Sequence, residues 1–295
     1  MENLLEKAKV LVEALPYIQK FRNAVVVVKF GGSAMENPEL IRSTMRDVVL
    51  MECIGMRPVV VHGGGKAITA ELTRRNIETK FVNGLRVTCA ETIKVVDDVL
   101  HNVINKNLID EAALFGGKAV SISGKEMLRA EKMYSKDQTT GEQIDIGFVG
   151  DIVGVDAEKI LEAVKNDIIP IIPPLGVGKD GQVYNINADI AACKIAEALK
   201  SRKLVFLSDV PGILSNPKDE STVIPTICTT EIDQLIADKV ITGGMIPKIL
   251  SSLHALNAGV SKVHMIDGRR EHSLLLEIFT DSGIGTQIVK PDSAS

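Results

Sequence analysis

The chain has 295 residues, 45% of them hydrophobic and 24% charged, which is typical of a globular protein of about two domains. This composition excludes a disordered chain, a collagen-like fibre and a coiled coil, and no apolar run approaches the roughly 18 residues of a membrane span. The net charge is −4 and only 3% of the residues are aromatic, so the chain lacks the basic excess and the stacking side chains typical of nucleic-acid binding. We therefore expect neither nucleic acid nor a membrane as a partner, and any anionic ligand must be held by local features.

The cysteines and histidines show no metal-binding pattern. The four cysteines, Cys53, Cys89, Cys193 and Cys228, are too far apart in sequence for a zinc pattern or a C-x-x-C pair, so we expect reduced thiols. Of the five histidines, only His62, beside three glycines, is expected near a site. The N-terminus is rich in Glu and lacks a basic region followed by an apolar run, so no targeting signal is predicted and a cytoplasmic location is expected.

The first predicted element is an N-terminal helix. Apolar residues recur there at helical spacing: Leu4, Ala8, Leu11, Leu15 and Ile18. Pro16 should kink this helix or end it near Leu15. Two interpretations remain open, a surface helix packed on its own domain or an arm that packs on another subunit, and its position ahead of the first core strand favours the arm.

Strands and helices then alternate along the chain. Strands are expected at 25–28, 58–61, 118–123, 168–172, 203–207 and 262–266, and helices at 39–51, 66–75, 157–166, 188–199 and 246–258. Residues 134–145 resemble a hairpin tip, 215–222 a loop, and 172–178 a hinge. The all-valine run at 25–28 is typical of a strand buried on both faces, so the pattern predicts an α/β fold, a three-layer αβα sandwich with a mainly parallel central sheet.

Several standard signatures are absent. The sequence contains no G-x-x-x-x-G-K-[ST], no G-x-G-x-x-G after a strand, no H-E-x-x-H and no G-x-S-x-G. This argues against a P-loop enzyme, a Rossmann dehydrogenase, a zinc protease and a serine hydrolase.

Glycine-rich segments instead follow predicted strands or open a predicted helix, at 29–33, 62–65, 208–212 and 242–248. Ligands of open α/β sheets bind beyond the carboxyl ends of the strands, and glycine lets backbone N–H groups approach an anion closely. Each segment alone could be a tight turn. Four glycine-rich segments at similar positions, two of them with a lysine, favour a phosphate-binding site at this edge of the sheet.

Three charged or polar positions strengthen this hypothesis. Lys29 ends a buried strand, where it could equally be an edge lysine that reaches solvent. Lys248 follows Pro247 at a helix start, where a cation opposes the helix dipole unless an anionic ligand offsets it. The polar cluster at 184–189 could be a helix cap or a ligand site, and three polar side chains exceed what one cap needs.

Taken together, these segments resemble the acetylglutamate kinases of the amino acid kinase family over nearly the whole chain. The matching motifs lie at 29–32, 61–65, 83–88, 105–106, 123–125, 145–150, 185–189, 208–212, 243–248, 266–269 and 274–281. The resemblance implies transfer of the γ-phosphoryl group of ATP to the side-chain carboxylate of N-acetyl-L-glutamate, in arginine biosynthesis. It also implies an amino-acid lobe at 23–180 and an ATP lobe at 181–295.

The resemblance assigns roles residue by residue. The catalytic residues would be Lys29, Lys248 and Asp189; the acceptor would be bound by Gly64, Gly65, Arg86, Asn185 and Asn187; the nucleotide would be bound by Gly31, Gly32, Ser208, Asp209, Val210, Gly212, Gly243, Gly244 and Met245. ATP would bring Mg²⁺ with it, and no metal site made by the protein is expected. A carboxylate nucleophile with a pKa near 4 is already ionised at neutral pH, so the reaction needs charge neutralisation and not a general base.

Residues 1–22 resemble the extra helix of the arginine-inhibited branch of this family. In that branch the helices interlace dimers into a hexamer, a trimer of dimers, and L-arginine binds between the helix and the C-terminal lobe. The resemblance places Tyr17, His272, Glu277 and Gly285 in that site, and it allows a nitrogen-signalling regulatory protein as a partner. Two other hypotheses stay open: a related kinase for another acyl acceptor, since the loop at 123–128 departs from the family pattern, and a catalytically weak arginine sensor.

Overall fold

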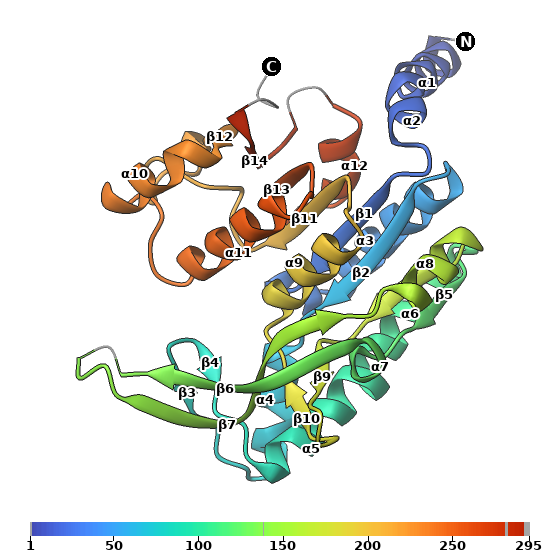
Figure 1. Ribbon diagram of the computed structural model, residues 1–295. Coiled ribbons are helices and arrows are strands. Elements are labelled where there is room, and N and C mark those ends of the chain that lie inside the picture. Colours follow the sequence, from blue (N-terminus) through green and yellow to red (C-terminus); the bar gives the residue numbers. More distant parts are fainter. Residues whose placement is uncertain (1, 138, 281–282, 292–295) are drawn as a thin grey trace.

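The computed structural model describes residues 2–137, 139–280 and 283–291 and is built around one eight-stranded sheet (Figure 1). The strands stand in the order β12 (Thr226–Cys228), β14 (Thr286–Val289), β13 (Lys262–Asp267), β11 (Lys203–Ser208), β1 (Val25–Phe30), β2 (Arg57–His62), β8 (Ile169–Ile172) and β5 (Ala119–Ser121). The six strands from β13 to β5 are parallel, while β14 and β12 run the opposite way. The expected mainly parallel sheet is confirmed.

Helices cover both faces of this sheet and complete the three layers. One face carries α8 (Glu158–Lys165), α9 (Ala188–Ala198) and α11 (Met245–Asn257); the other carries α3 (Pro38–Cys53), α4 (Gly65–Arg74), α6 (Lys106–Leu114) and α12 (Ser273–Ile278). Along β1, Val27 packs against the helices of the first face, and Val26 and Val28 pack against the helices of the second face. All three side chains are fully buried, so the prediction of a strand buried on both faces is confirmed.

A second group of strands lies beyond the carboxyl ends of the main sheet (Figure 1, lower left). The long hairpin of β6 (Leu128–Lys136) and β7 (Gln143–Val155) closes a small sheet with β9 (Leu175–Val177) and β10 (Val183–Asn185). The short hairpin of β3 (Phe81–Val82) and β4 (Leu85–Arg86) is tied to it, because the Asn83 side chain donates to Ser135 Oγ and to the Lys136 carbonyl. The hairpin tip expected within 134–145 is confirmed, whereas the expected hinge at 172–178 contains β9.

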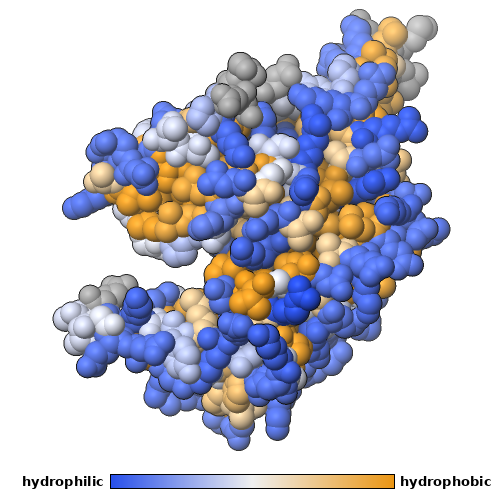
Figure 2. All heavy atoms as spheres, in the orientation of Figure 1, coloured by the Kyte–Doolittle hydropathy of each residue, from blue (hydrophilic) through white to orange (hydrophobic). Residues whose placement is uncertain are grey.

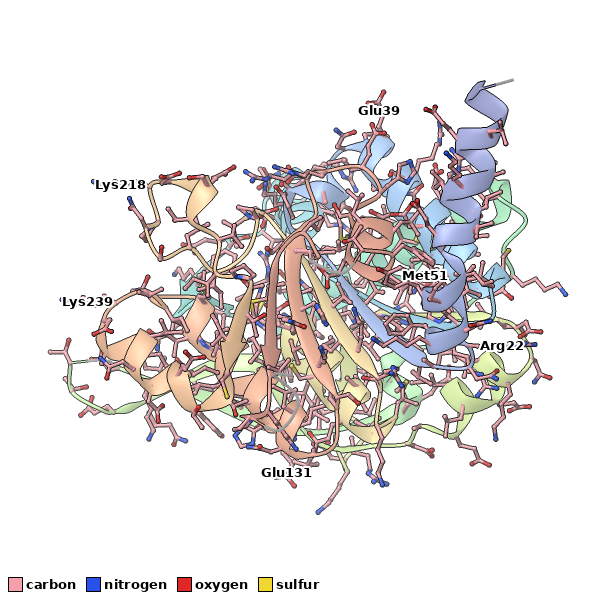
Figure 3. The ribbon with its side chains drawn as sticks, turned by 90° about the horizontal axis from the view of Figure 1, so that it is seen from above. Arg22, Glu39, Met51, Glu131, Lys218 and Lys239 are labelled. Atoms are coloured by element: carbon pink, nitrogen blue, oxygen red, sulfur yellow. The ribbon has the colours of Figure 1, made fainter. Side chains whose placement is uncertain are left out.

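The N-terminal segment breaks where the proline predicts. Helix α1 (Glu2–Glu13) and helix α2 (Leu15–Phe21) are separated at Ala14. The side chains of Leu5, Val10 and Leu11 are 59%, 64% and 73% exposed, and α1 projects from the rest of the molecule in both views (Figures 1 and 3). Such exposure of large apolar side chains favours the arm over a helix packed on its own domain.

Some elements were not anticipated from the sequence. Residues 90–114 form one long helical segment of α5 (Ala90–Asp98), the π-helical turn η2 (Val99–Asn105) and α6. The loop at 215–222 ends in a single helical turn, η3 (Glu220–Thr222), and further short elements are η1 (Gly32–Met35), α7 (Gly124–Met127), η4 (Thr229–Glu231) and α10 (Ile232–Ala237). Among the helices of the described residues, none combines the length and the apolar character that crossing a bilayer requires.

Candidate active site

Two lysines meet one carboxylate at the carboxyl-terminal edge of the central sheet. Lys29 stands near the end of β1, Lys248 in the first turn of α11, and Asp189 in the first turn of α9. The Lys29 Nζ lies 3.0 Å from Asp189 Oδ1, and the Lys248 Nζ lies 3.4 Å from Asp189 Oδ2. Burial raises the pKa of Asp189, but the two ammonium groups outweigh burial and hold that pKa below its ordinary value. The cluster therefore keeps a surplus of positive charge.

The starts of the two helices hold Asp189 and Lys248 in place. The Asn187 side-chain oxygen caps α9, since it accepts hydrogen bonds from the backbone N–H groups of Asp189 and Ile190 at 2.8 and 3.2 Å. The cap interpretation of this polar cluster is confirmed, and only the amide nitrogen of Asn187 remains for a ligand. Just before α11 begins, Gly243 adopts a left-handed backbone conformation (φ +54°).

The turn after β1 is hydrogen-bonded to the turn after the neighbouring strand β11. Asp209, which follows β11, accepts hydrogen bonds from the Ser33 backbone N–H and hydroxyl at 2.7 Å each. Gly32 adopts φ +75°, and a Cβ there would lie 2.4 Å from the Asp209 carboxylate. A side chain at Gly31 would likewise displace the Lys29 ammonium, because the two would stand 2.5 Å apart. Gly32 is required by its positive φ and by this close approach, whereas a side chain at Gly31 would shift the Lys29 ammonium.

The glycine loop after β2 packs directly against the first turn. The Gly63 N–H donates to the Phe30 carbonyl at 2.7 Å, and a Cβ at Gly63 would lie 3.7 Å from the Gly31 Cα. Gly65 opens α4, so the N–H groups of its first turn, which have no partner within the helix, lie at the same edge of the sheet as the lysines. Strand order β11–β1–β2 explains why the three turns meet.

Arg86 is a buried cation beside this loop. Its Nη2 donates to the Gly65 carbonyl and to Thr69 Oγ1, both at 2.8 Å, and its guanidinium lies 4.7 Å from the centre of the Phe81 ring. Within the described residues, its buried Nη1 has no hydrogen-bond partner. An unpaired guanidinium nitrogen in a buried position suits a carboxylate ligand. Asn185, the last residue of β10, donates to Thr88 Oγ1 at 3.4 Å in the same region.

The residues expected to bind the nucleotide follow β11 or open α11. Ser208 donates its hydroxyl to the Val210 carbonyl at 2.9 Å, and Gly212 packs against Thr286, where a Cβ would lie 2.7 Å from the hydroxyl oxygen. Figure 2 shows the surface deeply hollowed between the part that carries α10 and α11 and the part that carries the β3–β4 and β6–β7 hairpins. The arrowheads of β2 and β11 point toward this hollow in Figure 1.

A second, smaller cavity lies at the other end of the sheet, beneath α2. It measures about 250 Å³, and its lining includes Tyr17, Glu277 and Gly285, three of the four residues expected to bind arginine. Two basic residues that the sequence analysis missed contact Glu277 in this cavity: the Glu277 carboxylate lies 2.5 Å from His264 Nδ1 and 3.7 Å from Lys203 Nζ. Further cations in the lining are Lys20, Arg202 and Lys262. Burial lowers the pKa of Lys203 to about 8.

The fourth expected residue, His272, stands outside the lining of that cavity. It precedes α12 in a left-handed conformation, and its Nδ1 lies 2.6 Å from Asp47 on α3. Burial raises the pKa of Asp47 to about 6, although the His272 side chain opposes this. His272 lines instead a groove between the N-terminal helices and α12. A basic side chain inside an apolar strand, as in β11 and β13, was the signal that could have indicated Lys203 and His264.

The described residues bring no three His, Cys, Asp or Glu side chains together in a way that would hold a metal ion. All four cysteines are free thiols.

The chain matches the model of the amino acid kinase family over residues 24–267. An acetylglutamate kinase of Akkermansia muciniphila is 49% identical over 291 residues, which cover 97% of this chain and 97% of that protein. The acetylglutamate kinase of Petrotoga mobilis is also 49% identical, over 97% of this chain and 94% of the relative. That of Carboxydothermus hydrogenoformans is 47% identical, over 98% and 99%.

Solved structures share the fold. N-acetylglutamate synthase from Neisseria gonorrhoeae, complexed with coenzyme A and N-acetyl-glutamate, superposes with a TM-score of 0.84 at 25% identity and covers 96% of this chain. The chain spans 63% of that synthase. The same synthase complexed with coenzyme A and L-arginine gives 0.79 at 25% identity, over 96% of this chain and 65% of the synthase. Carbamate kinase from Giardia lamblia bound to AMP-PNP gives 0.64 at 15% identity, over 91% and 99%, and indicates the fold alone.

Proposed function

The chain belongs to the amino acid kinase family and, within it, to the acetylglutamate kinases, and on that premise we propose that it phosphorylates the side-chain carboxylate of N-acetyl-L-glutamate with ATP. The product is N-acetyl-L-glutamyl 5-phosphate, an intermediate of arginine biosynthesis. The observation that carries the proposal is the cluster of Lys29, Asp189 and Lys248 between glycine turns at one edge of the sheet. The free cysteines suit a reducing compartment, and we place the reaction in the cytoplasm.

The chemistry explains why two lysines stand here and no general base does. The attacking carboxylate is ionised at neutral pH, and its approach to the triphosphate is opposed by like charge. Lys29 and Lys248 offset this repulsion, while Asp189 on α9 orients the ammonium groups that β1 and α11 supply. Positioning and neutralisation of charge supply most of the catalysis in phosphoryl transfer. Mg²⁺ enters as part of the nucleotide substrate.

Acceptor binding is assigned to the residues around the second glycine loop. The guanidinium of Arg86 binds the α-carboxylate through its unpaired Nη1, and the amide nitrogens of Asn185 and Asn187 hold polar groups of the N-acetyl amino acid. The N–H groups of Gly64 and Gly65 face the reacting carboxylate and the phosphoryl group. The turns at 31–32, 208–212 and 243–245 hold the nucleotide.

The direct test is ATP- and Mg²⁺-dependent formation of an acyl phosphate, trapped by hydroxylamine, with N-acetylglutamate, glutamate and aspartate as competing acceptors. We expect hydroxamate with N-acetylglutamate and little with the other two, because only the first places an uncharged amide next to the Arg86-bound carboxylate. Turnover with aspartate or glutamate alone would assign the protein to another acceptor. The absence of hydroxamate with every acceptor would refute the kinase assignment.

We also propose that L-arginine inhibits this enzyme by binding in the cavity beneath α2. A small cavity with the buried carboxylate of Glu277 on one wall and Tyr17 of the N-terminal segment on another suits a guanidinium ligand. A structural relative, the Neisseria synthase, was solved with L-arginine. Arginine titration in the hydroxamate assay tests the proposal, and we expect Glu277→Gln to need at least about tenfold more arginine for half inhibition, about 1.4 kcal/mol.

We propose that the N-terminal arm joins three dimers into a hexamer. Leu5, Val10 and Leu11 on α1 are more than half exposed, and a partner's α1 would bury them. Light scattering on the full chain and on a chain lacking residues 1–20 tests this. We expect the full chain to form a hexamer, and the chain lacking residues 1–20 to form an active dimer that arginine no longer inhibits. A full chain that stays dimeric would refute the arm's role.

A further inference from the structure

A buried histidine lies directly beneath the second glycine loop, and the mechanism above does not use it. His62 ends β2, its side chain is fully buried, and Gly63 follows it at once. Burial lowers the pKa of His62 to about 4; the nearby His101 lowers it further, while the hydrogen bond to Gly63 opposes the shift. The ring is therefore neutral at the pH values at which a kinase of this kind works.

The partners of the ring fix its tautomer. His62 Nδ1 lies 2.9 Å from the Gly63 carbonyl oxygen, which can only accept, so Nδ1 carries the proton. The other ring nitrogen, Nε2, then accepts from the Asn105 side-chain amide at 3.2 Å. The same amide nitrogen also donates to the Ile171 carbonyl at 3.0 Å, which anchors it to β8.

The hydrogen bond to Gly63 also fixes a neighbouring donor. In a planar trans peptide, the carbonyl of Gly63 and the N–H of Gly64 point in opposite directions. With the carbonyl held toward the buried ring, the Gly64 N–H points away from the core, and within the described residues it has no hydrogen-bond partner. Arg86 holds the Gly65 carbonyl at 2.8 Å in the same manner. The protein thus holds the carbonyls of Gly63 and Gly65, and the Gly64 N–H is left for a ligand.

The π-helical turn η2 supports the loop from below. A Cβ at Gly64 would lie 2.7 Å from both Leu100 Cδ2 and Ile104 Cδ1, so the loop rests directly on η2. Asn105, the last residue of η2, is also the residue that holds the His62 ring. A π-turn inside a longer helix is costly and recurs at functional positions. Here the π-turn supplies both the apolar side chains that pack under Gly64 and the Asn105 amide that bonds to His62.

We propose that His62, held in its Nδ1-protonated form by Asn105, is a positioning residue that aims the Gly64 N–H at the phosphoryl group during transfer. This inference rests on the proposed kinase function. A backbone donor pre-aimed at developing negative charge costs no reorganisation at the moment of reaction, and removal of one such donor lowers kcat by about 10²–10³ in enzymes where it has been measured. The role requires the ring to stay neutral and in one tautomer.

The first experiment compares His62→Leu with His62→Asn in the full chain. We expect the leucine variant to lose at least tenfold in kcat while the KM for ATP changes less than threefold. The asparagine variant should recover most of the loss, because its amide nitrogen takes the place of Nδ1. Leu108→Ala is the matched control: Leu108 is fully buried on α6, one turn beyond Asn105, and its truncation lowers the melting temperature without removing a donor. A kcat that falls as far in Leu108→Ala, or stays within threefold in His62→Leu, would overturn the proposal.

The second experiment reads the ring directly. Nitrogen-15 spectra of the imidazoles in the wild-type protein should show His62 protonated at Nδ1 alone, without change between pH 5.5 and 8. A proton on Nε2, or titration within that range, would contradict the proposal. This readout does not depend on turnover, so a wild-type protein without kinase activity would refute the proposed function and leave the tautomer result standing on its own.

Discussion

Replacement of Lys29 by methionine tests the charge cluster most directly, since methionine retains much of the apolar stem and removes the ammonium. The Lys29 side chain is 12% exposed and lies 3.0 Å from Asp189, so its charge acts in a partly desolvated site. At an effective dielectric constant of 20 and a separation of 4 Å, a unit charge pair is worth about 4 kcal/mol. Only the part gained in the transition state lowers kcat, so we expect a loss between about tenfold and about 10³-fold.

The assay is hydroxamate formation at saturating ATP and acceptor, for Lys29→Met, Lys248→Met and the double variant. Both lysines contact the same carboxylate, so their effects should not add: the double variant should lose less than the product of the single losses. Lys194→Met is the matched control, because Lys194 lies on the same helix as Asp189 and pairs with Glu197 at 3.2 Å. A kcat within threefold of wild type in both single variants would refute the charge argument.

Three further predictions follow from the same geometry. Arg86→Lys should raise the KM for N-acetylglutamate by about tenfold or more with a smaller change in kcat, because a single ammonium nitrogen cannot replace the separate Nη2 and Nη1 of the planar guanidinium at the Gly65 carbonyl and the carboxylate; an unchanged KM in steady-state kinetics would contradict this. Gly32→Ala should weaken ATP binding, measured by calorimetry, because its Cβ would lie 2.4 Å from Asp209, whereas Gly181→Ala, also at positive φ but in open space, should bind ATP normally; equal affinities would show that the close approach is unimportant. Since His62 has a pKa of about 4 in the folded chain and about 6.5 when unfolded, the unfolded state binds more protons between these values, so stability is lost as pH falls from 6.5 to 4; His62→Asn should remove about 3 kcal/mol of this dependence in urea unfolding, and equal slopes would contradict it.

The sequence by itself determined the sheet and the glycine turns at its carboxyl-terminal edge. A run of four valines can be satisfied only where both faces of a strand are covered, and glycine directly after such strands marks the edge at which parallel strands place ligands. Lys29 could be singled out because it ends a buried strand, and Lys248 because a cation at a helix start is unfavourable without an anion; the structure places the Asp189 carboxylate beside both. These are local arguments, and they need only the order of elements along the chain.

Only the tertiary structure decided which distant residues share a cavity. Glu277 was expected to share a site with His272, five positions earlier in the chain, yet the His272 ring contacts Asp47 on α3. His264 and Lys203 meet Glu277 instead, because β13 and β11 lie side by side in parallel register.

The hydrogen bonds beneath the glycine loop were likewise decided only by the tertiary structure. Asn105 is 43 positions from His62 and reaches it only because η2 packs under the loop. A sequence pattern reports the period and burial of one element, whereas the partner of a buried polar group depends on strand order, register and the packing of a helix onto the sheet. Long-range pairings of this kind are fixed by the topology as a whole.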